Sequence, residues 1–389
     1  VAGWNLAHDA PRLHYGLLLL LQCATLGIFC ALDTVLFFVF WELTLVPLYF
    51  LLGRWGAVAG SARAASRYFL IMLAGGVPLL LAFVLLAASQ AVPTFDFLAL
   101  SAVPLPRATQ YAFLLLCLLG FGVKVPLVPL HTWLPQFALA APGSLTALLV
   151  GLKLGAYGLI RFAIPLAPDA VQDLHWLLAG LGTVTLIYGA VGILAQSNLR
   201  VALAYASICH VGLAVLGLAA FTASGVQGAV SLLLSFSVAT GGAFLLLEFL
   251  RQRTGSTDLH SLGGAAQTMP LLASGFLICG LAGVGMPGTS SFPGEFMLIL
   301  AALQSHTGAG MAALFGLAIA AGGFLALYRE AFFGPVTRRE VAEAADLRPR
   351  EWAVLVILIV LVGAIGVYPG PWLEIVRPAA EAWAAGLAR

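Results

Sequence analysis

Residues 121–135 read FGVKVPLVPLHTWLP, and they decide the fold because they place Lys124 inside an apolar run that prolines then interrupt. The next apolar run contains Lys153, and the sequence has no other lysine. Arginine remains protonated in proteins, whereas a lysine that is buried away from water can release its proton. The two lysines therefore indicate positions within hydrophobic segments where a proton can be taken up and released.

The composition is that of a membrane protein. Hydrophobic residues make up 61% of the 389 residues and charged residues only 9%, and the mean hydropathy is +1.03. These values exclude a soluble globular domain and predict an all-α, polytopic protein within the lipid bilayer. No basic cluster indicates a nucleic-acid partner. The five cysteines lie in apolar runs without the spacing of a metal site or a disulfide framework.

Apolar segments of about 20 residues, long enough to cross a bilayer, recur along the chain with short connections. Most arginines fall on one side when the segments are threaded alternately, and the positive-inside rule makes that side cytoplasmic. We predict about eleven transmembrane helices, near Tyr15–Ala31, Thr34–Leu52, Ser66–Ala88, Tyr111–Leu130, Ser144–Pro165, Leu174–Gln196, Leu199–Ala220, Val226–Leu250, Met269–Met286 with a broken continuation to Leu303, Ala309–Phe333 and Trp352–Pro371.

Two segments with helix-breaking residues resemble each other, Gly122–Pro126 in the fourth predicted helix and Gly283–Pro287 in the ninth. Copies that are five helices apart run in opposite directions across the membrane, which predicts inverted five-helix repeats with the transport path at the broken helices. The predicted division is a first repeat at 1–165 with its break around Lys124–Pro135, an inverted second repeat at 166–335 with its break around Pro287–Glu295, and a cytoplasmic loop with a final transmembrane helix at 336–389.

Four charged side chains fall within predicted helices or beside their breaks, where a charge costs about 2.5–3.5 kcal/mol on insertion scales. They are Glu42, Lys124, Lys153 and Glu295. We interpret Glu42 and Lys124 as a pair whose separation controls the proton of the lysine. Lys153 would be the next proton site and Glu295 the exit or relay group. A structural ion pair that joins two helices is the alternative for Glu42 and Lys124.

Two histidines are candidates for carrying protons between these sites. His210 lies in the middle of a predicted helix and is either a relay or a packing residue, and His131 follows the proline break and is either a relay or a cap. Glu248 precedes Arg251 by three residues near a helix end, which predicts a local ion pair. The sequence contains no nucleotide, flavin or iron–sulfur motif, so we expect this chain to bind no such cofactor.

Several motifs together carry a resemblance to a known family. They are FWELTLVP at 40–47, VKVPL at 123–127, HTWLP at 131–135, LKLGAYG at 152–158, AYAS at 204–207 followed by His210, and PGEF at 293–296. By these motifs the chain resembles the antiporter-like membrane subunits of respiratory complex I, most closely subunit M, and the resemblance covers nearly the whole chain.

The resemblance implies a proton-translocating subunit of NADH:quinone oxidoreductase in a bacterial inner membrane. Glu42 and Lys124 would correspond to the family's paired carboxylate and central lysine, Lys153 to its connecting lysine and Glu295 to its terminal carboxylate. The partners would be other membrane subunits of complex I, and the NADH, FMN, iron–sulfur clusters and quinone would be bound by partner subunits.

Three features depart from the family pattern. Family members usually have about three more helices before the one near Tyr15, so we expect a chain that is short at its N-terminus. Residues 136–143 lack the Asp, His and Glu often found there. The eighth predicted helix has Phe236 where the family usually has a histidine, so a relay through this helix would need Ser235, Ser237 or water.

Two other functions stay open at this point. The large subunits of multisubunit Na⁺/H⁺ antiporters and of membrane-bound hydrogenases share these helices, and Thr289, Ser290 and Ser291 beside Glu295 offer oxygen ligands suited to Na⁺. A structural scaffold with vestigial charges is the third possibility.

Overall fold

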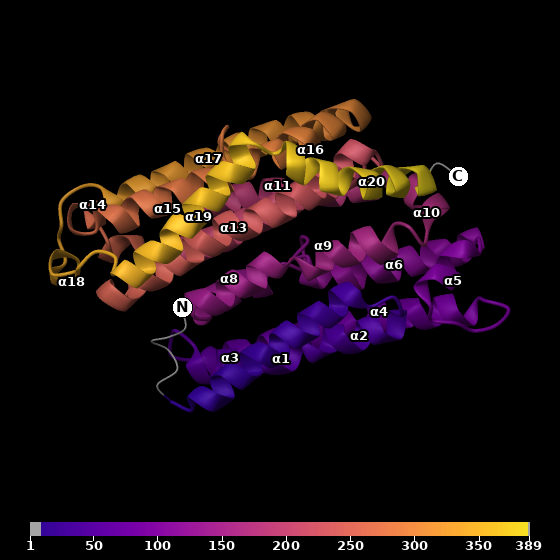
Figure 1. Cartoon of the computed structure of the whole chain (residues 1–389), viewed down its shortest axis with the longest axis horizontal. Helices are drawn as coiled ribbons and strands as arrows, with labels where there is room; N and C mark the ends of the chain where they lie inside the picture. The colour runs from indigo at the N-terminus through magenta and orange to yellow at the C-terminus, as the bar shows by residue number, and fades with distance from the viewer. Residues whose placement is uncertain (1–8, 388–389) are drawn as a thin grey trace. The chain divides into compact units, whose positions relative to one another are not determined.

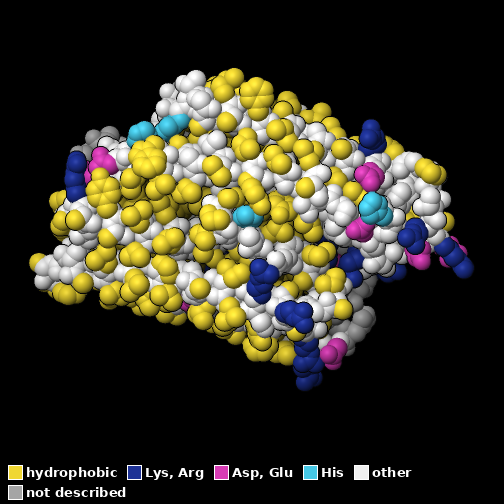
Figure 2. Space-filling model, turned by 180° about the vertical axis from the view of Figure 1, so that it is seen from behind, with side chains coloured by type: hydrophobic (Ala, Val, Ile, Leu, Met, Phe, Trp, Pro, Cys, Tyr) yellow, Lys and Arg dark blue, Asp and Glu magenta, His cyan; other side chains and the backbone are white. Residues whose placement is uncertain are grey.

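The computed structural model describes residues 9–387, and these residues form helices without any β-strand. Nine helical segments in this range are long and apolar enough to cross a membrane, and the helices Pro270–Gly283 and Phe292–Ser305 are shorter apolar segments. Hydrophobic side chains are spread over the face shown in Figure 2, and charged side chains gather mainly toward its two ends. The predicted all-α, multi-pass membrane fold is thereby confirmed.

The chain forms two compact units (Figure 1). The N-terminal unit comprises residues 9–141, 152–178 and 382–387 of the described range. The C-terminal unit comprises residues 142–151 and 179–381. Three helices have residues in both units: α8 at Gly143–Leu152, α11 at His175–Leu194 and α20 at Gly370–Leu387.

The N-terminal unit consists of helices that pack closely where glycines face a neighbour. A Cβ atom at Gly120 of α6 would lie 2.8 Å from Cβ of Leu79 in α4, so the two helices approach at a distance that only glycine permits. The elements are α1 Pro11–Cys30, α2 Thr34–Leu43, α3 Leu45–Trp55, α4 Ser61–Ala88, α5 Phe97–Ala102, α6 Arg107–Lys124, α7 Trp133–Ala140, α9 Leu154–Gly158, the π-helix Leu159–Ala163 and α10 Pro168–Asp173.

The C-terminal unit is built around α12, whose residues are almost all buried between other helices. A Cβ atom at Gly294 of α16 would lie 2.7 Å from the backbone nitrogen of Leu232 in α13, so these two helices are also in close contact. The elements are α8 Gly143–Leu152, α12 Leu199–Leu218, α13 Ala223–Thr254, a 3-10 turn at Leu259–Ser261, α14 Ala265–Thr268, α15 Pro270–Gly283, α16 Phe292–Ser305, α17 Thr307–Phe332, α18 Arg339–Ala342 and α19 Pro349–Val367.

Helix breaks lie where proline and glycine were expected to cause them. The fourth predicted helix ends at Lys124 rather than at Leu130, because Pro126 cannot donate the backbone hydrogen bond that would continue α6. The ninth ends at Gly283, and the chain resumes as α16 at Phe292. A break that was not predicted separates α2 from α3 at Thr44, close to Pro47.

The helix α20 was also not predicted. It follows the last predicted span and contains the charged residues Glu374, Arg377 and Glu381 together with Pro378. A segment of such mixed composition was not expected to cross the membrane, because a membrane-crossing helix needs an apolar run of about 20 residues. The helix forms nevertheless, with its polar and apolar side chains on different faces.

Candidate functional site

Lys124 lies at the last position of α6, where the helix ends. The backbone nitrogen of Leu127 donates to the Gly122 carbonyl at 3.0 Å, and the indole nitrogen of Trp133 donates to the Val123 carbonyl at 2.8 Å. These bonds satisfy carbonyl groups that the end of a helix leaves without intrahelical partners. These hydrogen bonds therefore fix the backbone of the break, with Lys124 as the last residue before it.

The ammonium group of Lys124 is hydrogen-bonded to residues at the break between α2 and α3. It donates to the Trp41 carbonyl at 3.2 Å and to the Thr44 hydroxyl at 3.0 Å. It also lies 3.8 Å from the centroid of the Trp41 ring, within the range of a cation–π interaction. Two helix breaks thus meet at one charged side chain.

Glu42 is a neighbour of Lys124 but is not hydrogen-bonded to it. The two side chains interact electrostatically, whereas both carboxylate oxygens of Glu42 lack a hydrogen-bond partner among the described residues. The carboxylate is packed against α4, where a Cβ atom at Gly76 would lie 2.2 Å from Oε1 of Glu42. Glycine at position 76 therefore makes the room that this carboxylate occupies.

Lys153 separates α8 from α9 and adopts a left-handed backbone conformation, with φ of 48°. This conformation costs about 1–2 kcal/mol in a residue other than glycine. The segment that follows contacts the α6 break, because a Cβ atom at Gly155 would lie 2.7 Å from the backbone nitrogen of Val125. Lys153 is thus placed by an element that touches the residue after Lys124.

Glu295 lies in the first turn of α16, directly after the second break. Its carboxylate packs against Gly285, where a Cβ atom would lie 1.9 Å from Oε2. Gly285 also has a positive φ of 69°, so both space and backbone conformation call for glycine at this position. The second break therefore encloses a carboxylate much as the first holds an ammonium group.

His210 contacts Glu295 directly. Its Nε2 lies 3.2 Å from Oε1 of Glu295, and its Nδ1 lies 2.7 Å from the Ala206 carbonyl oxygen one turn earlier in α12. The side chains are 2% and 6% exposed, so little solvent reaches the contact. The sequence identified both residues as candidates, and the structure shows that they form a pair.

The sequence profile of the family described as "NADH:quinone oxidoreductase/Mrp antiporter, TM" matches residues 31–320 of this chain. The chain belongs to this family. NAD(P)H-quinone oxidoreductase chain 4 3 of Trichormus variabilis is 36% identical over 381 residues, which is 95% of this chain and 70% of that protein. NADH-quinone oxidoreductase subunit M of Rickettsia typhi is 33% identical over 369 residues, 93% of this chain and 74% of that protein.

Chains of solved structures share the fold. A chain of respiratory complex I from Thermus thermophilus with bound NADH has a TM-score of 0.91 and 35% identity, covering 97% of this chain and 81% of that chain. A chain of the Mrp complex from Dietzia sp. has a TM-score of 0.83 and 21% identity, covering 95% of this chain and 79% of that one. The second likeness concerns the fold alone.

His131 lies in the first break of this family member and is buried. Its backbone carbonyl accepts a hydrogen bond from the nitrogen of Leu134 in the first turn of α7 at 3.0 Å. The main chain of His131 therefore helps to start α7. A role of its imidazole in proton transfer stays a prediction.

Glu248 forms the predicted ion pair with Arg251, at 2.7 Å, but it also binds two groups that sequence analysis missed. Arg200 of α12 donates to its Oε2 at 2.8 Å, and so does the backbone nitrogen of Gly143 at the start of α8. Arg200 lies in the first turn of α12. Its place in the first turn of a helix, where a positive charge is unfavourable, was the available signal that it has a special partner.

Proposed function

We propose that this chain is a proton-translocating membrane subunit of an NADH:quinone oxidoreductase, which moves protons through Glu42, Lys124, Lys153 and Glu295. The names of its relatives and its likeness to a chain of respiratory complex I support the redox partner. The observation that carries the proposal is that both helix breaks hold an ionisable side chain in a membrane-spanning region, Lys124 in one and the buried Glu295 in the other. Such groups are costly in a membrane and mark ion pathways.

The first half of the mechanism uses the position of the Lys124 ammonium group. In this arrangement the ammonium group donates to Thr44 and to the Trp41 carbonyl, while Glu42 has no hydrogen-bond partner within residues 9–387. A movement of the lysine side chain toward Glu42 pairs the opposite charges and retains the proton, and a movement away weakens that attraction. Redox chemistry in the partner subunits drives the change by shifting the helices that carry the two groups.

The second half of the path passes the proton from Lys153 to the His210–Glu295 pair. The left-handed backbone at Lys153 supports a functional role, because strained conformations persist where a side chain must be held in a special place. The proposal includes the division into inverted repeats at 1–165 and 166–335. It also assigns NADH, FMN, iron–sulfur clusters and quinone to partner subunits, with this chain lying among other membrane subunits of complex I.

Replacing Lys124 in the assembled complex tests the proposal. Lys124→Ala and Glu42→Ala should strongly reduce proton pumping and the quinone reduction coupled to it, measured in membrane vesicles. Lys124→Arg should fail as well, because arginine keeps the charge but does not release its proton. Arg107→Met is the control, since the Arg107 side chain is 69% exposed and pairs with Asp173 instead of with a group of the proposed path. Normal pumping by Lys124→Ala would refute the proposal.

A cation/proton antiporter is the second candidate, favoured by the hydroxyl groups in the second break. The side chains of Ser290 and Ser291 are buried, and their hydroxyl oxygens have no hydrogen-bond partner among the described residues. Oxygen atoms beside a carboxylate are the ligands that hard cations prefer. Sodium-dependent transport in vesicles without NADH-linked enzymes, abolished by Ser290→Ala with Ser291→Ala, would favour this function over the first.

A further inference from the structure

We propose that Phe236 of α13 is a positioning residue that holds the His210 imidazole so that His210 and Glu295 store one proton between Nε2 and Oε1. This inference rests on the proposed function and deepens it, since it replaces a relay group on α13 with a direct pair between α12 and α16. Three observations carry it: the hydrogen bond to Nδ1, the stacked ring of Phe236, and the packing of α13 against α16.

The Ala206 carbonyl determines which nitrogen of His210 exchanges protons. A carbonyl oxygen only accepts hydrogen bonds, so Nδ1, at 2.7 Å from it, carries a hydrogen and donates. The remaining nitrogen, Nε2, is the basic one, and it lies 3.2 Å from Oε1 of Glu295, although the two atoms are not hydrogen-bonded in this arrangement. Loading and unloading of a proton therefore occur at the edge of the ring that faces the carboxylate.

One proton satisfies this pair in either of two states. In the first state the imidazole is neutral and the carboxyl group is protonated, and in the second an imidazolium faces a carboxylate. The transfer breaks the Nε2–H bond and forms the Oε1–H bond, while the electron pair of the broken bond stays on Nε2. The pair is neutral overall in both states. Neither state therefore has an unpaired charge, which would be costly at a buried site.

Phe236 restricts the rotation of the imidazole. The centroids of the two rings are 4.4 Å apart and their planes make an angle of 27°, so the phenyl ring lies stacked on the face of His210. The second side-chain torsion of histidine has broad minima, and one hydrogen bond leaves the ring free to tilt about it. A stacked aromatic ring limits this freedom and keeps Nε2 beside the Glu295 carboxylate.

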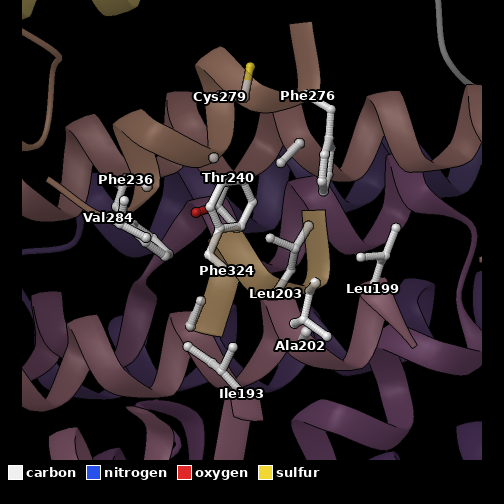
Figure 3. A pocket seen from close by; sticks show the side chains of 15 residues that line it. Ile193, Leu199, Ala202, Leu203, Phe236, Thr240, Phe276, Cys279, Val284 and Phe324 are labelled. Atoms are coloured by element: carbon white, nitrogen blue, oxygen red, sulfur yellow. The ribbon is translucent and has the colours of Figure 1, made fainter. Parts of the chain in front are cut away.

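The two serines beside Phe236 on α13 differ, because the buried hydroxyl of Ser235 has no hydrogen-bond partner among the described residues and is therefore the alternative proton carrier on this helix. Phe236 also lines an apolar cavity with Leu203, Val284 and Phe324 (Figure 3). Ser237, its neighbour on α13, already donates its hydroxyl hydrogen to backbone carbonyl groups, with Leu233 at 2.7 Å and Gly151 as acceptors. Phe236 therefore contributes shape and not a proton-carrying group.

The packing of α13 also fixes the acceptor. Leu232 precedes Phe236 by four residues, so both side chains lie on the same face of α13. At Leu232 the helix touches Gly294, the residue before Glu295, at a distance that admits no Cβ atom. The same part of α13 thus positions the His210 imidazole through Phe236 and the Glu295 carboxylate through the contact of Leu232 with Gly294.

The test measures proton pumping per electron by the assembled complex in vesicles. Phe236→Leu should lower pumping by about tenfold, because a misplacement of about 1 Å in a reacting group can cost about 100-fold. Phe236→Trp, which restores a flat aromatic face, should recover at least half of the pumping. This rescue separates a stacking role from simple filling of space. Phe244→Leu is the control, since Phe244 is equally buried on α13 and the same change there should leave pumping near the wild-type value.

Wild-type pumping by Phe236→Leu would overturn the inference, and so would a Ser235→Ala variant that loses as much as Phe236→Leu, because the proton would then travel along α13. Should the leucine variant not assemble, Phe236→Met replaces it. Lys124→Ala distinguishes failure of the proposed function from failure of the role of Phe236. If Lys124→Ala stops pumping and Phe236→Leu does not, the inference alone is wrong; if Lys124→Ala pumps normally, the proposed function is wrong.

Discussion

The ammonium group of Lys124 donates a hydrogen bond to the hydroxyl of Thr44 at 3.0 Å, across a break in the helix pair that also carries Glu42. Thr44 in turn donates to the Trp41 carbonyl at 2.8 Å, so the hydroxyl is held in the orientation that accepts from the lysine. A cation, a hydroxyl and a carbonyl thus form a small network beside a carboxylate that is not part of it.

Removal of the Thr44 hydroxyl should disturb this network without changing the volume of the side chain. We expect Thr44→Val to lower proton pumping by about fivefold, since the Lys124 ammonium group loses one of its two hydrogen-bond acceptors; a lost hydrogen bond to a charged group costs about 1.5–3 kcal/mol, and 1.4 kcal/mol is a factor of ten. Thr25→Val is the control, because the hydroxyl of the buried Thr25 donates to the Leu21 carbonyl of its own helix. Equal pumping by both variants would show that Thr44 has no special part.

A methyl group at position 76 should displace the Glu42 carboxylate. The Cβ atom of Gly76→Ala would lie 2.2 Å from Oε1, closer than real contacts allow, so the carboxylate must move away. We expect pumping to fall by about tenfold while the complex still assembles, because small misplacements of a reacting group have effects of this size or larger. Gly53→Ala gives the control, since its Cβ atom would meet Ala65 at an ordinary 3.7 Å.

The sequence could predict the breaks and the ionisable groups because both are local. Pro126 interrupts a helix wherever it occurs, and a lysine in a hydrophobic run is unusual in any fold. The partners of these groups could not be predicted in the same way. Whether Lys124 meets Thr44 or Glu42 depends on how α6 is rotated against α2 and α3, which packing between distant parts of the chain determines.

The same reason explains two further misses. Glu248 was assigned to Arg251 because they are three residues apart on one helix, whereas its bonds to Arg200 and Gly143 join segments 48 and 105 residues away along the chain. His210 and Glu295 were both candidates, but nothing in their spacing indicated that Phe236 would stack on one of them. Contacts of this kind follow from tertiary packing and not from periodicity.

Breaking the Glu248 cluster should reduce stability. Replacing Glu248 with Gln removes the negative charge that faces Arg200, and removal of one partner from a buried ion pair costs about 3–5 kcal/mol. We expect a clear fall in the melting temperature of the purified complex or in the amount of this subunit retained in it. Glu343→Gln is the control, since the Arg339–Glu343 pair is exposed and such pairs contribute about 0–1 kcal/mol. A change no larger than that of the control would contradict a stabilising role.

Gly285 and Gly288 allow the carboxylate contact to be separated from backbone strain. Both have positive φ, 69° and 85°, so alanine strains the backbone at either position by about 1–2 kcal/mol. Only at position 285 would the new Cβ atom meet the Glu295 carboxylate, at 1.9 Å from Oε2, whereas position 288 has nothing within 4 Å. Proton pumping is measured for equal amounts of assembled complex. Gly285→Ala should then lower pumping at least tenfold more than Gly288→Ala, because a carboxylate moved by about 1 Å no longer lies beside His210 in the same way. Equal loss in both variants would mean that strain in the break, and not the place of Glu295, limits transport.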